Sequence, residues 1–239
     1  MGKFTVEQIN QLNDTLKTPQ EILKWTLDNL HPKVAFASSF GAEDVVVIDM
    51  LMKINPKARI FTLDTGRLNQ ETYDVMDEIR NKYNIHIEVM FPDQNEVEQM
   101  VRINGMNLFY QSIGNRKLCC GIRKVHPLNK MLATLDGWIT GLRGDQTQNR
   151  SDAKRIEMDE QHNIIKVNPI IEWKWEQVWD YIKANKIPYN KLHDKGYPSI
   201  GCEPCTRAIK PGEDLRAGRW WWETDPEKEC GLHADHGNK

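Results

Sequence analysis

The feature that most restricts the fold is the alternation of short apolar runs with longer segments of helical periodicity. The runs "KVAFA", "ARIFTL" and "IHIEVMF" precede the helix-like segments "EDVVVIDMLMKI", "QETYDVMDEIRNKY" and "NEVEQMVRI". This rhythm of strand, crossover helix and strand is typical of a parallel sheet covered by helices. "GWITGL" and "IIKVNPI" add predicted strands, and "WEQVWDYIKAN" a final helix. We predict an α/β fold with an open, mostly parallel sheet and helices on both faces.

The periodic pattern has a clear beginning and a clear end. In "TPQEILKWTLDNL", Thr18 is a predicted helix N-cap, with Pro19 in the first turn and Glu21 at the capping-box position. After about Asn190 the apolar periodicity stops, and Gly, Pro, Cys, Arg and Trp dominate. We therefore divide the chain into an α/β part, residues 1–190, and an irregular lobe and tail, residues 191–239, both belonging to one domain.

Composition and charge exclude several classes of protein. With 239 residues and 39% hydrophobic content, the chain can bury one sizeable core. The 32 Lys and Arg against 34 Asp and Glu give no global attraction to nucleic acid or to an anionic membrane. The N-terminal stretch has no signal-peptide run and no later run approaches membrane-spanning length, so we expect a cytoplasmic protein. Five cysteines in a reducing compartment are not expected to form structural disulfides.

Three loops that follow predicted strands contain residues suited to binding an anion. Ligands of open α/β sheets bind beyond the carboxyl ends of the strands. In the first loop, "SSFGAED", the hydroxyls, a flexible Gly41 and the amides of the next helix could cradle an anion. An ordinary strand-to-helix turn with an N-cap is the alternative for this loop.

The second and third loops add arginines. "LDTGR" places Asp64 and Arg67 at the end of the next strand, where Arg67 could make a forked contact with phosphate or sulfate, or could be an exposed turn arginine. "GLRGDQTQNR" combines two glycines with Arg143 and Arg150. Three such loops in register favour an anion site.

Four of the five cysteines form two close pairs, Cys119 with Cys120 and Cys202 with Cys205. Four thiols suffice for zinc or for an iron–sulfur cluster. Adjacent cysteines suit zinc poorly, because zinc pairs usually have two to four intervening residues. A cubane spreads its iron corners over a larger body, so neighbouring residues can each take one. We favour a cluster over two alternatives, buried small hydrophobic cysteines and a thioredoxin-like redox pair.

The fifth cysteine, Cys230, lies in the tail sequence "ECGLH". Only a thiolate is a nucleophile, and neighbouring cations lower the pKa of a cysteine. Arg207, Arg216 and Arg219 lie upstream, and His233 follows. Cys230 is therefore a candidate nucleophile, with an exposed tail thiol of no function as the alternative.

Taken together, these motifs resemble one known family. "SSFGAED", "LDTGR", "CCGIRK", "GLRGDQTQNR", "GCEPCT" and "ECGLH" are similar, in the same order, to the assimilatory, thioredoxin-dependent adenylyl sulfate reductases of the adenylyl/phosphoadenylyl sulfate reductase family. The likeness runs from about Ser38 to His233 and does not include the first thirty or so residues. The residues around Gly121 differ from the more acidic or basic residues expected there in the family, but every residue with an implied function is present.

The resemblance implies a nucleotide-binding α/β fold related to the PP-loop ATP pyrophosphatases, and a 4Fe-4S cluster on Cys119, Cys120, Cys202 and Cys205. It further implies a reaction in two steps. Cys230 attacks the sulfur of adenylyl sulfate and AMP leaves, and thioredoxin then attacks the resulting S-sulfocysteine and releases sulfite. The cluster need not transfer electrons, because the two thiols of thioredoxin supply them.

Attack by a thiolate on an anionic sulfate requires fixed cations. Lys124, Arg143, Arg216 and Arg219 are the candidates, and the resemblance places Lys124 beside both the cluster and the substrate. His233 would orient or tune the thiol. The remaining substrate-binding candidates, taken from the three loops, are Ser38, Ser39, Gly41, Asp64 and Arg67.

Several alternatives remain open. Another PP-loop enzyme, such as a tRNA-thiolating one, would share the fold, but its typical SGGxDS loop is absent from "SSFGAED". A phosphoadenylyl sulfate reductase would share the tail and lack the cluster cysteines, and a dual-specificity enzyme would also accept the 3′-phosphorylated substrate. A zinc-binding interaction module would leave Cys230 and the three loops unexplained. We expect a homo-oligomer that binds adenylyl sulfate and thioredoxin.

Overall fold

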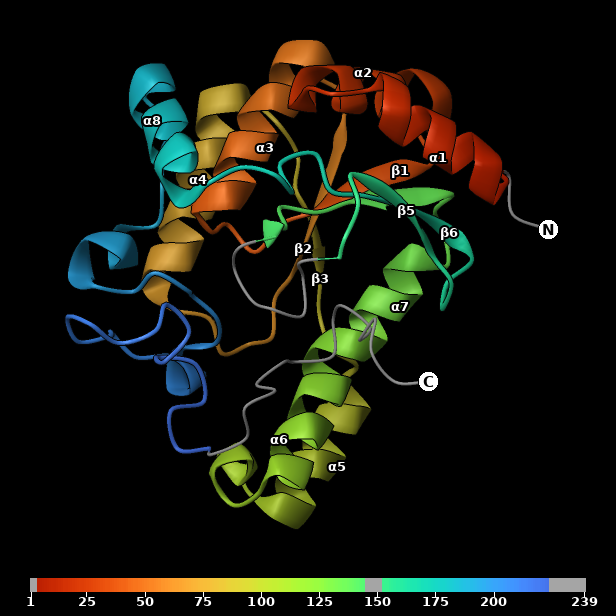
Figure 1. Ribbon diagram of the computed structural model, residues 1–239. Helices are drawn as coiled ribbons and strands as arrows, with labels where there is room; N and C mark the ends of the chain where they lie inside the picture. Colours follow the sequence, from red (N-terminus) through yellow and green to blue (C-terminus); the bar gives the residue numbers. More distant parts are fainter. Residues whose placement is uncertain (1–3, 145–151, 224–239) are drawn as a thin grey trace.

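The computed structural model describes residues 4–144 and 152–223. Six strands form one sheet in the order β3-β2-β1-β4-β6-β5 (Figure 1). The first five strands of this order are parallel, and β5 pairs antiparallel with β6 at one edge. The predicted open, mostly parallel sheet is confirmed. The strands are β1 (Val34–Ala37), β2 (Arg59–Leu63), β3 (Glu88–Met90), β4 (Gly137–Ile139), β5 (Ile156–Asp159) and β6 (Ile164–Val167).

Helices cover both faces of this sheet, as the sequence pattern predicts (Figure 1). The longer helices are α1 (Val6–Thr15), α2 (Pro19–Leu30), α3 (Ala42–Ile54), α4 (Gln70–Tyr83), α5 (Gln94–Asn104), α6 (Ile113–Cys120), α7 (His126–Leu132) and α8 (Trp175–Asn185). Shorter helical turns are η1 (Leu108–Tyr110), η2 (Gly121–Val125), η5 (Lys191–Lys195) and η6 (Glu203–Cys205).

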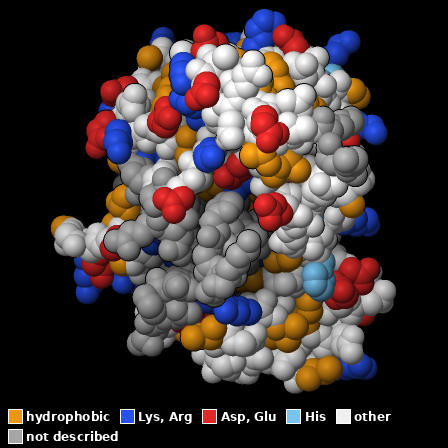
Figure 2. Space-filling view, turned by 45° about the vertical axis from the view of Figure 1, so that its right-hand side comes forward, with side chains coloured by type: hydrophobic (Ala, Val, Ile, Leu, Met, Phe, Trp, Pro, Cys, Tyr) orange, Lys and Arg blue, Asp and Glu red, His pale blue; other side chains and the backbone are white. Residues whose placement is uncertain are grey.

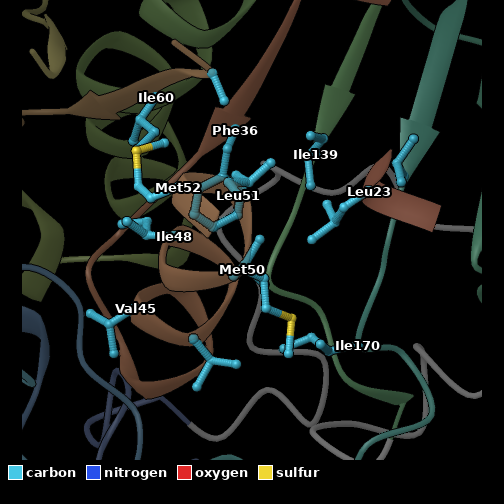
Figure 3. Close-up of a cluster of buried hydrophobic side chains, with 14 of the residues drawn as sticks. Leu23, Phe36, Val45, Ile48, Met50, Leu51, Met52, Ile60, Ile139 and Ile170 are labelled. Atoms are coloured by element: carbon cyan, nitrogen blue, oxygen red, sulfur yellow. The ribbon is translucent and has the colours of Figure 1, made fainter. Parts of the chain in front are cut away.

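The side chains of β1 divide the core into two layers. Val34 and Phe36 point into the larger layer, where α2, α3, α4 and α8 pack. Ala35 points into the smaller layer, which is closed by α7. Successive strand residues face opposite sides of a sheet, so a continuous apolar run such as "KVAFA" is what a strand buried on both faces requires. Figure 3 shows side chains of α3 meeting Phe36, Ile60 and Ile139 of three neighbouring strands in the larger layer.

A local signal located the start of α2 correctly. Thr18 caps α2 with a reciprocal capping box to Glu21, as predicted. The same device begins α1, where Thr5 and Gln8 exchange hydrogen bonds, although the sequence analysis did not identify this helix. The antiparallel strand β5 and the helical segment α6–η2–α7 were also missed, because their apolar residues are few or irregularly spaced.

The region after Asn190 contains only short helical turns in its described part, as expected. The Glu203 amide donates to the Arg67 carbonyl oxygen (2.8 Å), which attaches this region to the loop after β2. The boundary at residue 190 stays a prediction.

The surface mixes charges of both signs. Figure 2 shows acidic and basic side chains interspersed on one face, in keeping with the small net charge. Hydrophobic side chains gather at the lower end of this view, at the height of α5 and α6 in Figure 1. Exposed apolar residues there include Ile103, Met106 and Ile113. Within the described residues, no helix has the length and apolar character needed to span a bilayer.

Candidate active site

The strand order creates a crevice beside β1. From β1 the chain builds outward to β2 and β3, and it later returns to place β4 on the other side of β1. The loops after β1 and β4 therefore diverge, and such a switch point is where open α/β sheets bind ligands. A cavity of about 240 Å³ lies here. Among the residues singled out from the sequence, it is lined by Ser38, Ser39, Gly41, Lys124, Arg143, Arg216 and Arg219.

The loop after β1 is folded around one of its own carboxylates. The Ser39 amide and hydroxyl both donate to Asp44 Oδ2, at 2.5 and 2.8 Å, and the Phe40 amide donates to Ser38 Oγ at 3.1 Å. Phe40 adopts a left-handed φ of 58°, which its fully buried ring holds in place. Burial raises the pKa of Asp44 to about 6, against the lowering effect of the Ser39 hydrogen bonds. The Ser39 amide and hydroxyl, which we expected to hold a substrate anion, thus donate to a carboxylate of the chain itself.

The loop after β4 approaches this carboxylate closely. A side chain at Gly141 would collide with Asp44 Oδ1, so only glycine allows the two loops to meet. Arg143 is almost fully buried, and its Nε donates to Glu43 Oε1 at 2.9 Å. Its guanidinium lies over the Trp175 ring, 5.2 Å from the centroid. The part of the cavity formed by the loops after β1 and β4 is hereafter the sheet end. There the positive charge of Arg143 is balanced by Glu43.

The cysteine-bearing segments, hereafter the cysteine lobe, are α6, the π-helical turn η2, and residues 199–223. Lys124 of η2 and several residues after 198 also line the cavity. Arg219 is buried, and its Nη1 donates to Ser199 Oγ (3.2 Å) and to the Ile200 carbonyl oxygen (3.4 Å). Its Nε has no partner in the described part of the chain. Gly201 lies directly against this guanidinium and leaves room for it. Buried polar atoms are almost always paired, so this nitrogen requires an acceptor that the described residues do not supply.

The four paired cysteines all lie in this lobe as free thiols. Cys120 and Cys205 are buried in a cluster with Trp220 and Ile122, and Cys119 and Cys202 pack against it. Cys202 Sγ lies 3.3 Å from the hydroxyl oxygen of Thr65, at the end of β2. The two pairs, 82 and more positions apart in the chain, are thus brought together, as predicted.

The electrostatics of the thiols favours a bound cationic centre. Burial, and then the neighbouring Cys202 and Cys120, raise the pKa of Cys205 to about 12. Burial likewise raises the pKa of Cys119, while Arg123 opposes the rise. Cys119 and Cys205 therefore lose a proton less readily than a thiol in water, and a bound iron or zinc ion would offset that cost. In the ranges 4–144 and 152–223, no three His, Cys, Asp or Glu side chains converge as they would on a single metal ion.

Lys124 links the two kinds of site. It follows the adjacent cysteines on η2, and its side chain lines the cavity. Its charge, with that of Arg219, lowers the pKa of Cys205 against the effect of burial. The cationic character of "CCGIRK" is therefore shared between the thiols and the cavity.

Asp64 and Arg67, in contrast, do not line the cavity. The Asp64 carboxylate accepts from the Gly66 amide within its own turn (2.7 Å) and from the Tyr73 hydroxyl of α4 (3.0 Å). The Arg67 guanidinium donates to the Met106 carbonyl oxygen and to the Asn107 side chain, and it lies over the Phe109 ring. Arg67 thus uses its fork to hold the segment before η1.

Some residues predicted from the sequence lie outside the described ranges, and some residues of the cavity were not predicted. Cys230, His233 and Arg150 lie outside the described residues. Glu43, Asp44, Trp175 and His193 line the cavity and were not assigned a role from the sequence. Acidic residues in the first turn of a helix are ordinary helix-stabilising residues, and nothing near His193 marks it as a cavity residue, so no local signal could have identified them.

The chain is similar to known proteins over most of its length. Residues 33–208 match the phosphoadenosine phosphosulfate reductase domain. The chain is 50% identical, over 85% of its length and 81% of the relative, to the adenosine 5′-phosphosulfate reductase of Burkholderia cepacia. It is 43% identical to the enzyme of the same name from Allochromatium vinosum, over 92% of this chain and 87% of that one.

Solved structures are similar as well. The phosphate complex of phosphoadenylyl-sulfate reductase from Candida auris has a TM-score of 0.75 at 30% identity, covering 87% of this chain and 98% of that one. The FMN adenylyltransferase of Candida glabrata, with its bound ATP analogue, has a TM-score of 0.57 at 13% identity, over 89% and 71% of the two chains, and shares the fold alone.

Proposed function

The chain belongs to the phosphoadenosine phosphosulfate reductase domain family, among the adenosine 5′-phosphosulfate reductases, and from this membership we propose that it reduces adenylyl sulfate to sulfite and AMP in sulfate assimilation. The observation that carries the proposal is a cavity at the switch point that is lined by buried Arg219 and half-buried Lys124, in the same lobe as four cysteine thiols. Such a cavity suits a nucleotide whose charged end lies against the cysteine lobe.

The phosphosulfate group of the substrate would lie against Arg219, Lys124 and Arg216. Arg219 supports this placement best, because its buried Nε lacks a partner in the described residues and its two acceptors are uncharged. As the sulfur–oxygen bond breaks, negative charge develops on the departing phosphate. Cations fixed in a site with little water stabilise that charge in the transition state.

Cys119, Cys120, Cys202 and Cys205 would hold a 4Fe-4S cluster. The donor set fits such a group, because four cysteine thiols lie in or against one cluster with Trp220. A cubane accepts one thiolate at each of four separate irons, so its ligands need not converge on one point. When bound, the cluster supplies the iron that replaces the four thiol protons.

The reaction would proceed through Cys230. Its thiolate attacks the sulfur of adenylyl sulfate, a bond forms between the two sulfur atoms, and the bond from sulfur to the phosphate oxygen breaks to release AMP. A thioredoxin thiolate then attacks Cys230 Sγ, sulfite leaves with the electron pair, and the second thioredoxin thiol closes the disulfide. Thioredoxin thus supplies both electrons. His233 would orient or tune the Cys230 thiol, a role that the family resemblance supports.

The test of this function is a single-turnover experiment. Holoenzyme incubated with adenylyl sulfate and no thioredoxin should gain one sulfonate on the peptide that contains Cys230, and reduced thioredoxin should remove it. Cys230→Ser should keep the iron–sulfur absorbance and bind AMP, yet release no sulfite, because a hydroxyl has a far higher pKa than a thiol. An adduct on another cysteine, or comparable turnover by the serine variant, would contradict the mechanism.

Use of the 3′-phosphorylated substrate is the second candidate, and the similarity to the phosphoadenylyl-sulfate reductase of Candida auris favours considering it. The cluster cysteines favour adenylyl sulfate. A comparison of kcat/KM for the two compounds, with thioredoxin as reductant, decides between them. Thioredoxin as the partner, a cytoplasmic location, a homo-oligomeric assembly and the absence of a nucleic-acid partner are parts of the same proposal.

A further inference from the structure

The chain from Thr206 to Arg219 forms a closed loop, hereafter the cavity loop. It begins directly after Cys205, and the backbones of its first and last residues form an isolated antiparallel bridge. One position inside this bridge, the Arg207 amide donates to the Gly218 carbonyl oxygen at 3.0 Å. A side chain at Gly218 would collide with the Arg207 carbonyl oxygen, so only glycine lets the two ends of the loop lie this close.

Two neighbouring residues of the cavity loop, Leu215 and Arg216, line the cavity. Leu215 is also 44% exposed, so this part of the loop borders the opening of the cavity. The backbone of Arg216 is held on both sides. Its amide donates to Asp214 Oδ1 at 2.8 Å, and its carbonyl oxygen accepts from the Arg219 amide at 2.8 Å. The position of the Arg216 side chain therefore depends on the conformation of the loop.

An ion pair inside the cavity loop fixes that conformation. Arg207 Nη1 and Nη2 donate to the two carboxylate oxygens of Glu213, at 2.8 and 3.1 Å. The same carboxylate accepts from the Lys210 amide (2.8 Å), and the Glu213 amide donates to the Lys210 carbonyl oxygen (3.1 Å). Pro211 and Gly212 (φ 86°) occupy the two central positions of this turn, as is typical of a type II turn. One carboxylate thus ties the turn to the start of the loop.

The Arg207–Glu213 pair differs in geometry from an ordinary surface ion pair. Both side chains are partly exposed, and most single ion pairs at such exposure contribute little to stability. Here two charge-assisted hydrogen bonds join the groups as a fork, which fixes their orientation as well as their distance. The bonds from Arg207, and then from the Lys210 amide, lower the pKa of Glu213 to about 2. The carboxylate therefore stays ionised throughout the neutral pH range.

We propose that Glu213 is a positioning residue: through Arg207 and the loop that this pair closes, it holds Arg216 in place to meet the anionic group of the substrate. The inference rests on the proposed function, which places the phosphosulfate group against Arg216. Neither Glu213 nor Arg207 lines the cavity, so the effect of the pair is indirect. A loop that is ordered before the substrate arrives binds it more tightly, because its ordering then takes nothing from the binding free energy.

Binding of adenylyl sulfate without turnover tests this role, with Cys230→Ser holoenzyme as the parent protein. Glu213→Gln removes the charge that Arg207 binds through both nitrogens, so it should raise the dissociation constant about fivefold. Glu88→Gln is the matched control, because Glu88 and Arg59 form the same forked pair, at 2.8 and 2.9 Å. These two are the first residues of β3 and β2, whereas the cavity lies beyond the carboxyl ends of the strands. The control should leave the constant unchanged.

A double-mutant cycle tests whether the effect passes through Arg216. Arg216→Ala should itself weaken the binding of adenylyl sulfate. Adding Glu213→Gln to it should cause no further loss, because the side chain that Glu213 positions is then absent.

Steady-state turnover with Cys230 intact separates positioning from a loss of folded enzyme. Glu213→Gln should raise KM about fivefold and leave kcat within about twofold of wild type, since the loop is ordered once, when the substrate binds. Partial unfolding would instead lower kcat at an unchanged KM, because it removes active enzyme without altering the rest.

Each result has a defined reading. If holoenzyme neither binds adenylyl sulfate nor releases sulfite from it, the proposed function itself is wrong. If it does both, three results would each show that Glu213 does not position Arg216, while the proposed function stands. They are a dissociation constant that Glu213→Gln leaves unchanged, an equal loss in the Arg216→Ala background, and a fall in kcat alone.

Discussion

The sheet end of the cavity and the cysteine lobe are built in opposite ways. At the sheet end the polar groups are paired within the protein: Ser39 donates twice to Asp44, and Arg143 pairs with Glu43, 100 positions away. The lobe depends on contacts between distant segments: Arg116 pairs with Glu223, 107 positions away, and Thr65 contacts Cys202, 137 positions away. It also contains thiols with raised pKa values and an arginine nitrogen that lacks a partner in the described residues.

This contrast distinguishes a sheet end that forms without a ligand from a lobe whose structure depends on a bound group. Polar groups of the sheet loops are mostly paired within the protein, so that end should persist without any bound group. Within the described residues, the lobe gathers buried groups whose partners would come from a cluster or a substrate. We therefore expect changes in the lobe to have the largest effects on activity and changes in the sheet loops to have smaller ones.

The largest effect is expected from Cys202→Ser or Cys119→Ser. Loss of one thiolate should release the cluster, and sulfite production should fall at least about a thousandfold. The loops after β1 and β4 also line the cavity and are unchanged in these variants, so AMP should still bind, with a dissociation constant within about tenfold of wild type. Iron and sulfide assays, the absorption spectrum and calorimetry measure these quantities. Stoichiometric zinc without iron in a fully active wild type would contradict the cluster.

The second effect concerns the buried pair that closes the lobe. Arg116 Nε and Nη2 donate to the two oxygens of Glu223 at 3.0 and 2.9 Å, both side chains are almost fully buried, and the guanidinium lies over the Trp220 ring. Arg116 precedes Cys119 by three positions on the same helix, so this pair joins the cysteine-bearing helix to the C-terminal segment.

Glu223→Gln should destabilise the lobe by about 3 kcal/mol, because it leaves a buried guanidinium without its counter-charge. The midpoint of urea unfolding, followed by tryptophan fluorescence and by cluster absorbance, measures the change. Glu213→Gln is the control, since the Arg207–Glu213 pair has the same two residue types on the surface of the same region. Equal shifts of the midpoint in both variants would show that burial of the Arg116 pair contributes nothing.

The same contrast explains what the sequence could predict. β1 and α3 follow from a buried apolar run, a turn and a periodic segment, all of which are local patterns. The four cysteines could be grouped because their residue type restricts their chemistry. The partners of Arg116, Arg67 and His193 depend on how distant segments pack, and an isolated arginine or histidine has no periodicity that would reveal a partner.

Arg67 shows this limit most clearly. Its position after a strand suggested an anion contact, yet its guanidinium donates to the Met106 carbonyl oxygen and the Asn107 side chain, about forty positions later. The sequence could place it at the correct edge of the sheet, but not decide whether its fork faces the cavity or the neighbouring segment.

The smallest expected effect tests whether the hydrogen bonds from Ser39 fully offset the cost of burying the Asp44 carboxylate at the sheet end. Burial raises the pKa of Asp44 from 3.8 to about 6, even though Ser39 donates twice to its carboxylate. A carboxyl group with a higher pKa in the folded state binds its proton more tightly there than in the unfolded chain. Its contribution to stability therefore falls as the pH rises from about 4 to about 6, and stays reduced above that range.

Asp44→Asn removes this titration and keeps an oxygen that can accept from Ser39. Between pH 5 and pH 7.5 the stability of the variant should rise, relative to wild type, by about 1 kcal/mol. Urea unfolding of both proteins at four pH values within this interval measures the difference, and all other titrating groups cancel in the comparison. If the two stability profiles run parallel, the hydrogen bonds from Ser39 offset the burial of Asp44 completely, and the sheet end stores no electrostatic cost. If the profiles converge or cross as the pH rises, the ionised carboxylate of Asp44 destabilises the fold where the two loops meet at Gly141. Asp44 is then retained because its carboxylate can contact a ligand in the cavity.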